Sequence, residues 1–85
     1  ERKITRSDIK AGFTMTNENG VKYLVVESDC SLRIMNMDHF VIGPKLCDMM
    51  YEDMSPFISY ATIVEVKDRE GKIIYKENKY GNTRN

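Results

Sequence analysis

Short runs of alternating or β-branched apolar residues dominate the chain, and such runs are typical of strands. The clearest run is residues 21–27 (VKYLVVE). Apolar side chains fall on both of its faces, so we expect a strand in the centre of a sheet or beneath a second layer. Further strands are expected over residues 13–16, 32–37, 40–42, 61–67 and 72–76.

Turn-forming residues separate these runs. Asn19-Gly20 offers two residues that tolerate positive φ, which predicts a type I′ hairpin turn. Polar turns are also expected at residues 28–31 and 68–71. Gly43-Pro44 is expected to end the short strand at 40–42, because both residues interrupt regular structure.

Two segments favour helix instead. Ser7-Asp8 predicts the cap of a short helical turn that ends at Gly12. Residues 45–54 (KLCDMMYEDM) lack alternation and predict one or two helical turns, which Ser55-Pro56 ends. Three apolar residues of this segment share one helical face: Leu46, Met49 and Met50.

Five or six short strands and one short helix predict a mainly β fold, either a small barrel or a rolled antiparallel sheet. The chain has 85 residues, of which 41% are hydrophobic and 31% charged. This size and composition predict one globular domain over residues 1–85, with frayed ends at 1–3 and 78–85. No apolar run approaches the roughly 20 residues of a membrane-spanning helix, and no leader sequence is visible, so we expect no membrane association.

Four pieces of the chain resemble a group of small phage and prophage proteins. They are residues 7–12 (SDIKAG), 20–25 (GVKYLV), 51–54 (YEDM, with Asp53 one position closer to Tyr51 than in the group) and 63–66 (IVEV). The resemblance implies an SH3-like β-barrel, a binding role and a place in the cytoplasm of a bacterial host cell. It implies no activity for any single residue.

Opposite charges balance over the whole chain but are segregated along it. Lys and Arg number 13, as do Asp and Glu, so the net charge is zero and strong nonspecific nucleic-acid binding is not expected. Residues 27–55 nevertheless carry a charge of −4, and the segments on either side carry +2 each. The acidic segment is either a solvated face or a patch that imitates nucleic-acid phosphates.

The residue types that carry catalysis or bind metals do not form a recognisable pattern. Cys30, His39 and Cys47 lack zinc-finger spacing, and one histidine without an orienting partner does not make a Cys–His nucleophile. Asp48, Glu52 and Asp53 lack the alternation of a calcium loop. We therefore expect no enzyme, no metal and no cofactor, and we expect reduced thiols as in other intracellular proteins.

A partner-binding surface is predicted from eight residues. Exposed methionines make adaptable contacts, and uncharged loop aromatics need a partner or a core. The predicted residues are Arg33, Met35, Met37, Tyr51, Glu52, Asp53, Phe57 and Tyr60. Two alternatives stay open for the methionines, which lie either beneath the helix or in a seam between copies of the chain.

The leading hypothesis is a phage-type protein that inhibits or sequesters a host factor, such as one of a defence system, through this surface. A second hypothesis is a small-molecule sponge that binds a nucleotide-like ligand. It requires a homo-oligomer, since one chain of this length is expected to lack a pocket of several hundred Å³. A third hypothesis is an RNA-binding barrel that uses Tyr75 and Tyr80 among the terminal lysines.

Overall fold

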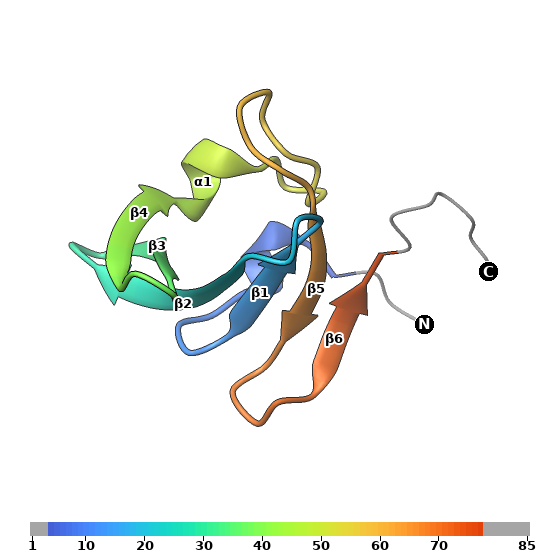
Figure 1. The fold of residues 1–85 in the computed structure, drawn as a ribbon, viewed down its shortest axis with the longest axis horizontal. Coiled ribbons are helices and arrows are strands. Elements are labelled where there is room, and N and C mark those ends of the chain that lie inside the picture. Colours follow the sequence, from blue (N-terminus) through green and yellow to red (C-terminus); the bar gives the residue numbers. More distant parts are fainter. Residues whose placement is uncertain (1–3, 78–85) are drawn as a thin grey trace.

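The computed structural model describes residues 4–77, which form one six-stranded antiparallel sheet and one short α-helix (Figure 1). The strand order is β4-β3-β2-β1-β5-β6, with β4 and β6 at the two edges. The elements are η1 (Arg6–Asp8), β1 (Thr14–Asn17), β2 (Lys22–Ser28), β3 (Ser31–Asn36), β4 (Val41–Lys45), α1 (Leu46–Met49), β5 (Ile63–Lys67) and β6 (Ile73–Lys76). The predicted mainly β fold is confirmed, as a rolled open sheet. The predicted fraying at 1–3 and 78–85 lies outside the described residues.

The core lies on one face of the sheet, because successive side chains of a strand alternate between faces. Met15 of β1 is opposite Val66 of β5, and both are completely buried. Val25 of β2 is opposite Ile34 of β3 in the same layer. The remaining buried apolar side chains come from α1, from the start of β5 and from the connecting segments, and they are Ile4, Ile9, Leu46, Met49, Met50, Met54 and Ile63.

The two tightest turns differ from the prediction. At Asn19-Gly20 only Gly20 has a positive φ (86°), and its amide donates to the carbonyl of Asn17 at 3.0 Å. This geometry matches a type I turn followed by a left-handed glycine. The type I′ geometry occurs instead at Asp29 (φ 53°) and Cys30 (φ 61°), which join β2 to β3. The predicted type I′ turn at Asn19-Gly20 is therefore wrong, although a hairpin does form there.

Gly43 and Pro44 lie inside β4, so the prediction that they end a strand is wrong. The register shifts between Arg33 and Met35, so that Gly43 and Pro44 together oppose the single residue Ile34. β4 has a neighbour on one side only, and an edge strand or a bulge tolerates the missing N–H of a proline. A glycine fits because a Cβ on Gly43 would lie 3.3 Å from Cγ1 of Ile34.

Both helical segments are shorter than predicted. α1 is a single turn, since Met50 already has an extended backbone and forms a bridge with Pro56. η1 is capped by Thr5, whose amide donates to the Asp8 carboxylate at 2.8 Å, and it ends at Ile9 rather than at a later glycine. The single helical turns α1 and η1 serve mainly to direct neighbouring apolar side chains into the core.

Candidate functional site

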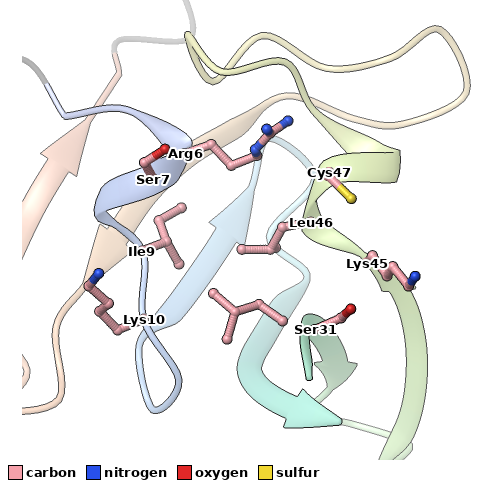
Figure 2. Close-up of a pocket in the computed structure, with 9 residues that line it drawn as sticks. Arg6, Ser7, Ile9, Lys10, Ser31, Lys45, Leu46 and Cys47 are labelled. Atoms are coloured by element: carbon pink, nitrogen blue, oxygen red, sulfur yellow. The ribbon is translucent and has the colours of Figure 1, made fainter. Parts of the chain in front are cut away.

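A recess of about 320 Å³ lies between the N-terminal segment and the junction of β4 with α1 (Figure 2). The start of β3 closes its third side. Nine residues line it: Arg6, Ser7, Ile9, Lys10, Ser31, Leu32, Lys45, Leu46 and Cys47. We call it the cationic recess, because three of these residues carry a positive charge and none carries a negative one.

The floor of the cationic recess is apolar and its rim is charged. Ile9 and Leu46 are buried and extend toward the middle of the view in Figure 2. Lys10 and Lys45 lie on opposite sides of them with their side chains pointing outward, and the Arg6 side chain lies above. An apolar floor below a few charged groups is the usual construction of a site for a small ligand.

Arg6 is held in place by the loop that follows α1. One guanidinium nitrogen donates to the carbonyl of Met50 at 2.8 Å, and another lies 3.3 Å from the Glu52 carboxylate. Glu52 also accepts hydrogen bonds from the hydroxyl and the amide of Ser7. The hydrogen bonds from the Ser7 hydroxyl and amide lower the pKa of Glu52, and the Arg6 charge adds a smaller effect in the same direction. Glu52 therefore offsets much of the Arg6 charge.

Lys10 and Lys45 have no such counterpart. Within residues 4–77, the ion pairs do not include either ammonium group. Lys10 is exposed, and Lys45 is partly buried at the end of β4. The uncompensated charge of the cationic recess therefore comes from these two lysines.

A second feature is an exposed apolar surface at the β4 edge of the sheet. Phe40 is 73% exposed, Val41 61% and Ile42 52%. Met37 in the preceding turn is also exposed, and Met35 is partly buried. We call these five residues the β3–β4 apolar surface.

Met35 and Ile42 of the β3–β4 apolar surface lie on the outer face of the sheet, whereas Val41, opposite Asn36, points to the other face. Met35 is paired with Leu24 on one side and with Ile42 on the other, so the three side chains form a row across three strands. Lys22 and Arg33 share this face by alternation along their strands. Arg33 also donates a hydrogen bond to the Gly43 carbonyl at 3.1 Å, which fixes its guanidinium next to β4.

The structure places the eight predicted partner-binding residues in two groups. Arg33, Met35 and Met37 belong to β3 and the turn after it. Tyr51, Glu52, Asp53, Phe57 and Tyr60 belong to the segment between α1 and β5. Because Met50 and Met54 of that segment are buried with Ile34, the segment covers the core face, whereas Met35 points to the opposite face.

The loop group has its own internal order. The rings of Tyr51 and Phe57 are tilted against each other with centroids 4.4 Å apart. The amide of Phe57 donates to the Met49 carbonyl at 3.0 Å, and Ser55 bonds to the Asp53 carboxylate. Ile58 at the tip is fully exposed. The binding role predicted for these residues remains a prediction.

The acidic residues at 27–55 do not share one face. Asp29 lies in the turn at one end of β3, and Asp38 lies in the turn at the other end. A six-residue strand is about 20 Å long, so these two carboxylates are far apart. Glu52 is engaged by Arg6 and Ser7. The charge of −4 that residues 27–55 carry is thus spread over β2, α1 and several loops.

Two features were missed by reasoning from sequence. The cationic recess exists in a single chain, which contradicts the expectation that a pocket of this size needs an oligomer. The exposure of residues 40–42 was also missed, since an apolar run gives no sign of whether its strand is at an edge. The glycine and proline that follow the run were such a sign, because prolines inside sheets belong at edges or bulges.

Cys30 and Cys47 are both free and exposed, the first in the β2–β3 turn and the second in α1. In the described part of the chain, no group of three or more His, Cys, Asp or Glu residues is arranged to hold a metal ion. Within the same residues, no helix is long and apolar enough to cross a membrane. Tyr75 is partly buried and donates to Glu77 at 3.0 Å, whereas Tyr80 lies outside the described residues.

Comparisons with known protein families, with curated proteins and with solved structures find no match. The two surfaces described above are therefore the observations from which a function can be proposed. The resemblance to small phage proteins, and the SH3-like barrel that it implies, remain expectations from the sequence.

Proposed function

We propose that the protein is a non-enzymatic binding module whose β3–β4 apolar surface docks a segment of a partner protein. The observation that carries the proposal is the run of three exposed apolar residues at the start of an edge strand, with Phe40 in the turn before β4 and Val41 and Ile42 in β4 itself. Each Å² of apolar surface removed from water contributes about 25 cal/mol, so covering these side chains favours association. Contiguous exposed apolar patches on small proteins commonly mark interaction sites.

The charges beside this surface define the chemistry of the partner. Lys22 and Arg33 flank the row of Leu24, Met35 and Ile42, and the outward positions of β2 and β3 carry no carboxylate. A partner segment with acidic residues next to apolar ones fits this arrangement. A second copy of the chain fits less well, because a two-fold interface would bring Lys22 and Arg33 toward their own counterparts.

The geometry of β4 favours contact through side chains rather than strand addition. Pro44 lacks an N–H, and the bulge at Gly43-Pro44 interrupts the free edge after Ile42. Phe40 and Ile42 are therefore the anchors that we propose, with Met35 and Met37 as the adaptable rim. That the partner is a host protein follows from the resemblance to phage proteins.

A peptide library selected on the wild-type protein tests this proposal. We expect the selected peptides to combine apolar and acidic residues. Ile42→Asp and Arg33→Glu should each weaken the binding of such a peptide by at least about tenfold, the usual loss at an interface hot spot. Ile58→Asp is the matched control, because it places the same charge on an exposed isoleucine of the α1–β5 loop.

Peptides whose binding is lost in Ile58→Asp or Phe57→Asp, but kept in Ile42→Asp, would move the site to the loop and overturn the proposal. Sedimentation of the wild-type protein adds a second readout. Self-association that Met35→Asp abolishes would show that the surface binds another copy instead of a different partner.

A further inference from the structure

We infer that Arg33 and Lys45 together bind a carboxylate of the partner segment, next to the apolar row of Leu24, Met35 and Ile42. The inference rests on the proposed function and adds the place where an acidic residue of the partner binds. It follows from the strand register, because β3 and β4 put these two basic residues directly opposite each other.

Arg33 and Lys45 are two like charges on the outer face of the sheet. Directly opposed residues of an antiparallel pair have Cβ atoms about 4.5–5.5 Å apart, and like charges at that distance destabilise the pair. The residue opposite Arg33 on its other side is the uncharged Val26. Within residues 4–77, the ion pairs include neither Arg33 nor Lys45. An anion from outside the chain would therefore remove a repulsion that the fold leaves in place.

Both basic side chains are placed to reach such an anion. One guanidinium nitrogen of Arg33 donates to the Gly43 carbonyl at 3.1 Å, which holds the planar group beside β4. A guanidinium has five N–H donors, so a carboxylate can still accept from Arg33. The Lys45 side chain points away from the cationic recess (Figure 2). The outward positions of β2, β3 and β4 carry no carboxylate that could compete with the partner.

The distance between the charges and the apolar row sets a spacing in the partner. Arg33 and Met35 are two positions apart on β3, so their side chains share a face and are separated by about 7 Å along the strand. Residues i and i+2 of an extended peptide share one side at the same distance. A segment that fits both features therefore carries an acidic residue two positions from an apolar one.

The side chains of this face favour a peptide over a nucleic acid. Single-stranded nucleic acids bind through phosphates and through bases that stack on aromatic rings. The outward positions of β2, β3 and β4 hold aliphatic, polar and basic side chains and no aromatic ring. Leu24, Met35 and Ile42 instead offer contacts to the aliphatic side chains of a peptide.

Titration with two synthetic peptides, followed by NMR of the backbone amides, is the direct test. In the first peptide, Ser-Glu-Ser-Leu-Ser-Glu-Ser-Leu, the acidic and apolar side chains share one side of the extended chain. The second, Ser-Ser-Glu-Leu-Ser-Ser-Glu-Leu, has the same composition but places them on opposite sides. We expect the first to bind at least about threefold more tightly and to shift the amides of Val26, Arg33 and Lys45. Equal binding of the two peptides would contradict the spacing.

Lys45→Gln tests the charge pair with the first peptide. The variant should bind it at least about tenfold more weakly, because the carboxylate loses a charge-assisted contact. Lys22→Gln is the matched control, since Lys22 lies on the same face but opposite the uncharged Thr16. This control should lose less than about threefold, as expected for an exposed charge. Equal losses in the two variants would show that the peptide responds to the charge of the whole face, and would overturn the site.

Thermal unfolding without peptide gives a second readout. Lys45→Gln removes one of two opposed like charges, so its unfolding midpoint should rise by about 1–4 °C. A residue whose role is structural would behave in the opposite way. A midpoint below that of the wild type would show that Lys45 stabilises the fold, and would contradict the inference.

Ile42→Asp separates a failure of this inference from a failure of the proposed function. Loss of the first peptide in Ile42→Asp, with full binding in Lys45→Gln, would keep the docking surface and remove the carboxylate site. Full binding in both variants would overturn both. No binding to the wild type would overturn this inference alone, because the peptide library tests the docking surface separately. Tighter binding of an eight-nucleotide oligothymidylate through Arg33 and Lys45 would replace the carboxylate with phosphates.

Discussion

Arg6 and Glu52 are joined at two points, through their side chains at 3.3 Å and through a backbone hydrogen bond from the Arg6 amide to the Glu52 carbonyl at 2.9 Å. These contacts fasten the loop after α1 to the N-terminal segment. Because Arg6 also forms part of the cationic recess, the same pair links the shape of the recess to the position of the loop.

The Glu52 carboxylate, held mainly by Ser7 and to a smaller extent by Arg6, predicts a loss of stability in acid. The pKa of Glu52 is lowered below its ordinary value of 4.5, chiefly by the Ser7 hydroxyl. The unfolded chain therefore takes up a proton at a higher pH than the folded chain does. The contribution of Glu52 is fully present above pH 4.5 and is lost as the pH falls through the lowered value.

Urea unfolding of the wild type and of Glu52→Gln over this acidic range measures that contribution. We expect a smaller acid-dependent fall in the variant. Glu70→Gln, which removes an exposed turn carboxylate, should follow the wild type. Parallel curves for the wild type and Glu52→Gln would show that the ionised Glu52 carboxylate does not stabilise the fold.

Because of Tyr75, we predict that the folded protein loses stability at alkaline pH. Burial, together with the hydrogen bond to Glu77, raises the pKa of Tyr75 to about 12. The unfolded tyrosine ionises near its ordinary value of 10, so the stabilising contribution is present below pH 10 and is lost between there and about 12. Tyr75→Phe should remove this part of the pH dependence. Lysines titrate in both proteins and cancel in the comparison, and phenolate absorbance reports the ionisation directly.

We predict that alanine substitution lowers the free energy of unfolding by different amounts at Gly12 and Gly20. Both have a positive φ (94° and 86°), so alanine is strained at either position by about 1 kcal/mol. A Cβ at Gly12 also lies 2.9 Å from Cγ of Arg69, whose Nε donates to the Ala11 carbonyl at 2.7 Å. Gly12→Ala should therefore cost about 1 kcal/mol more than Gly20→Ala.

Thermal unfolding of both glycine variants, each with and without Arg69→Ala, isolates the part of the stability loss that comes from the contact with Arg69. In the Arg69→Ala background the two glycine substitutions should become equal. A difference that persists there must come from the backbone and not from the arginine.

We predict that the buried side-chain amide of Asn17 stabilises the β1–β2 turn. Its side-chain oxygen accepts from the amides of Asn19 and Val21 at 2.8 and 3.0 Å, and the residue is only 6% exposed. Asn17→Ala leaves both donors without this acceptor and should cost about 2 kcal/mol. Asn19→Ala, at an exposed position in the same turn, should cost less than about 0.5 kcal/mol. Equal midpoints in urea would contradict this role.

The strands could be predicted from sequence because their signals are local. The β-branched and apolar runs at 21–27 and 32–37 indicated β2 and β3, whereas the sequence did not decide which face is buried, since 21–27 is apolar on both faces; the structure buries Val25 and Ile34. The errors came where tertiary context decides. Gly43-Pro44 is compatible with a strand only because β4 is an edge, and Asp29-Cys30 adopts left-handed backbone because a two-residue connection requires it.

The candidate sites were harder to predict, because their residues are distant in sequence. The cationic recess combines Lys10, Leu32 and Lys45, and only the strand pairing brings them to one place. The methionine part of the predicted surface, Met35 and Met37, lies beside the exposed β4 edge. The aromatic part of the predicted surface, in the segment between α1 and β5, lies apart from these methionines, because the buried side chains of Met50 and Met54 hold that segment on the core face.

The pairing of β1 with β5 has a consequence for the order of folding. β1 through β4 are joined by short hairpins, whereas Met15 finds its partner Val66 about fifty positions later in the chain. Closing so long a loop is entropically costly and slow compared with forming a hairpin. We therefore expect the first four strands to associate early and the β1–β5 pairing to limit the folding rate. During synthesis, Met15 stays open to water, and to other chains, until Val66 has left the ribosome.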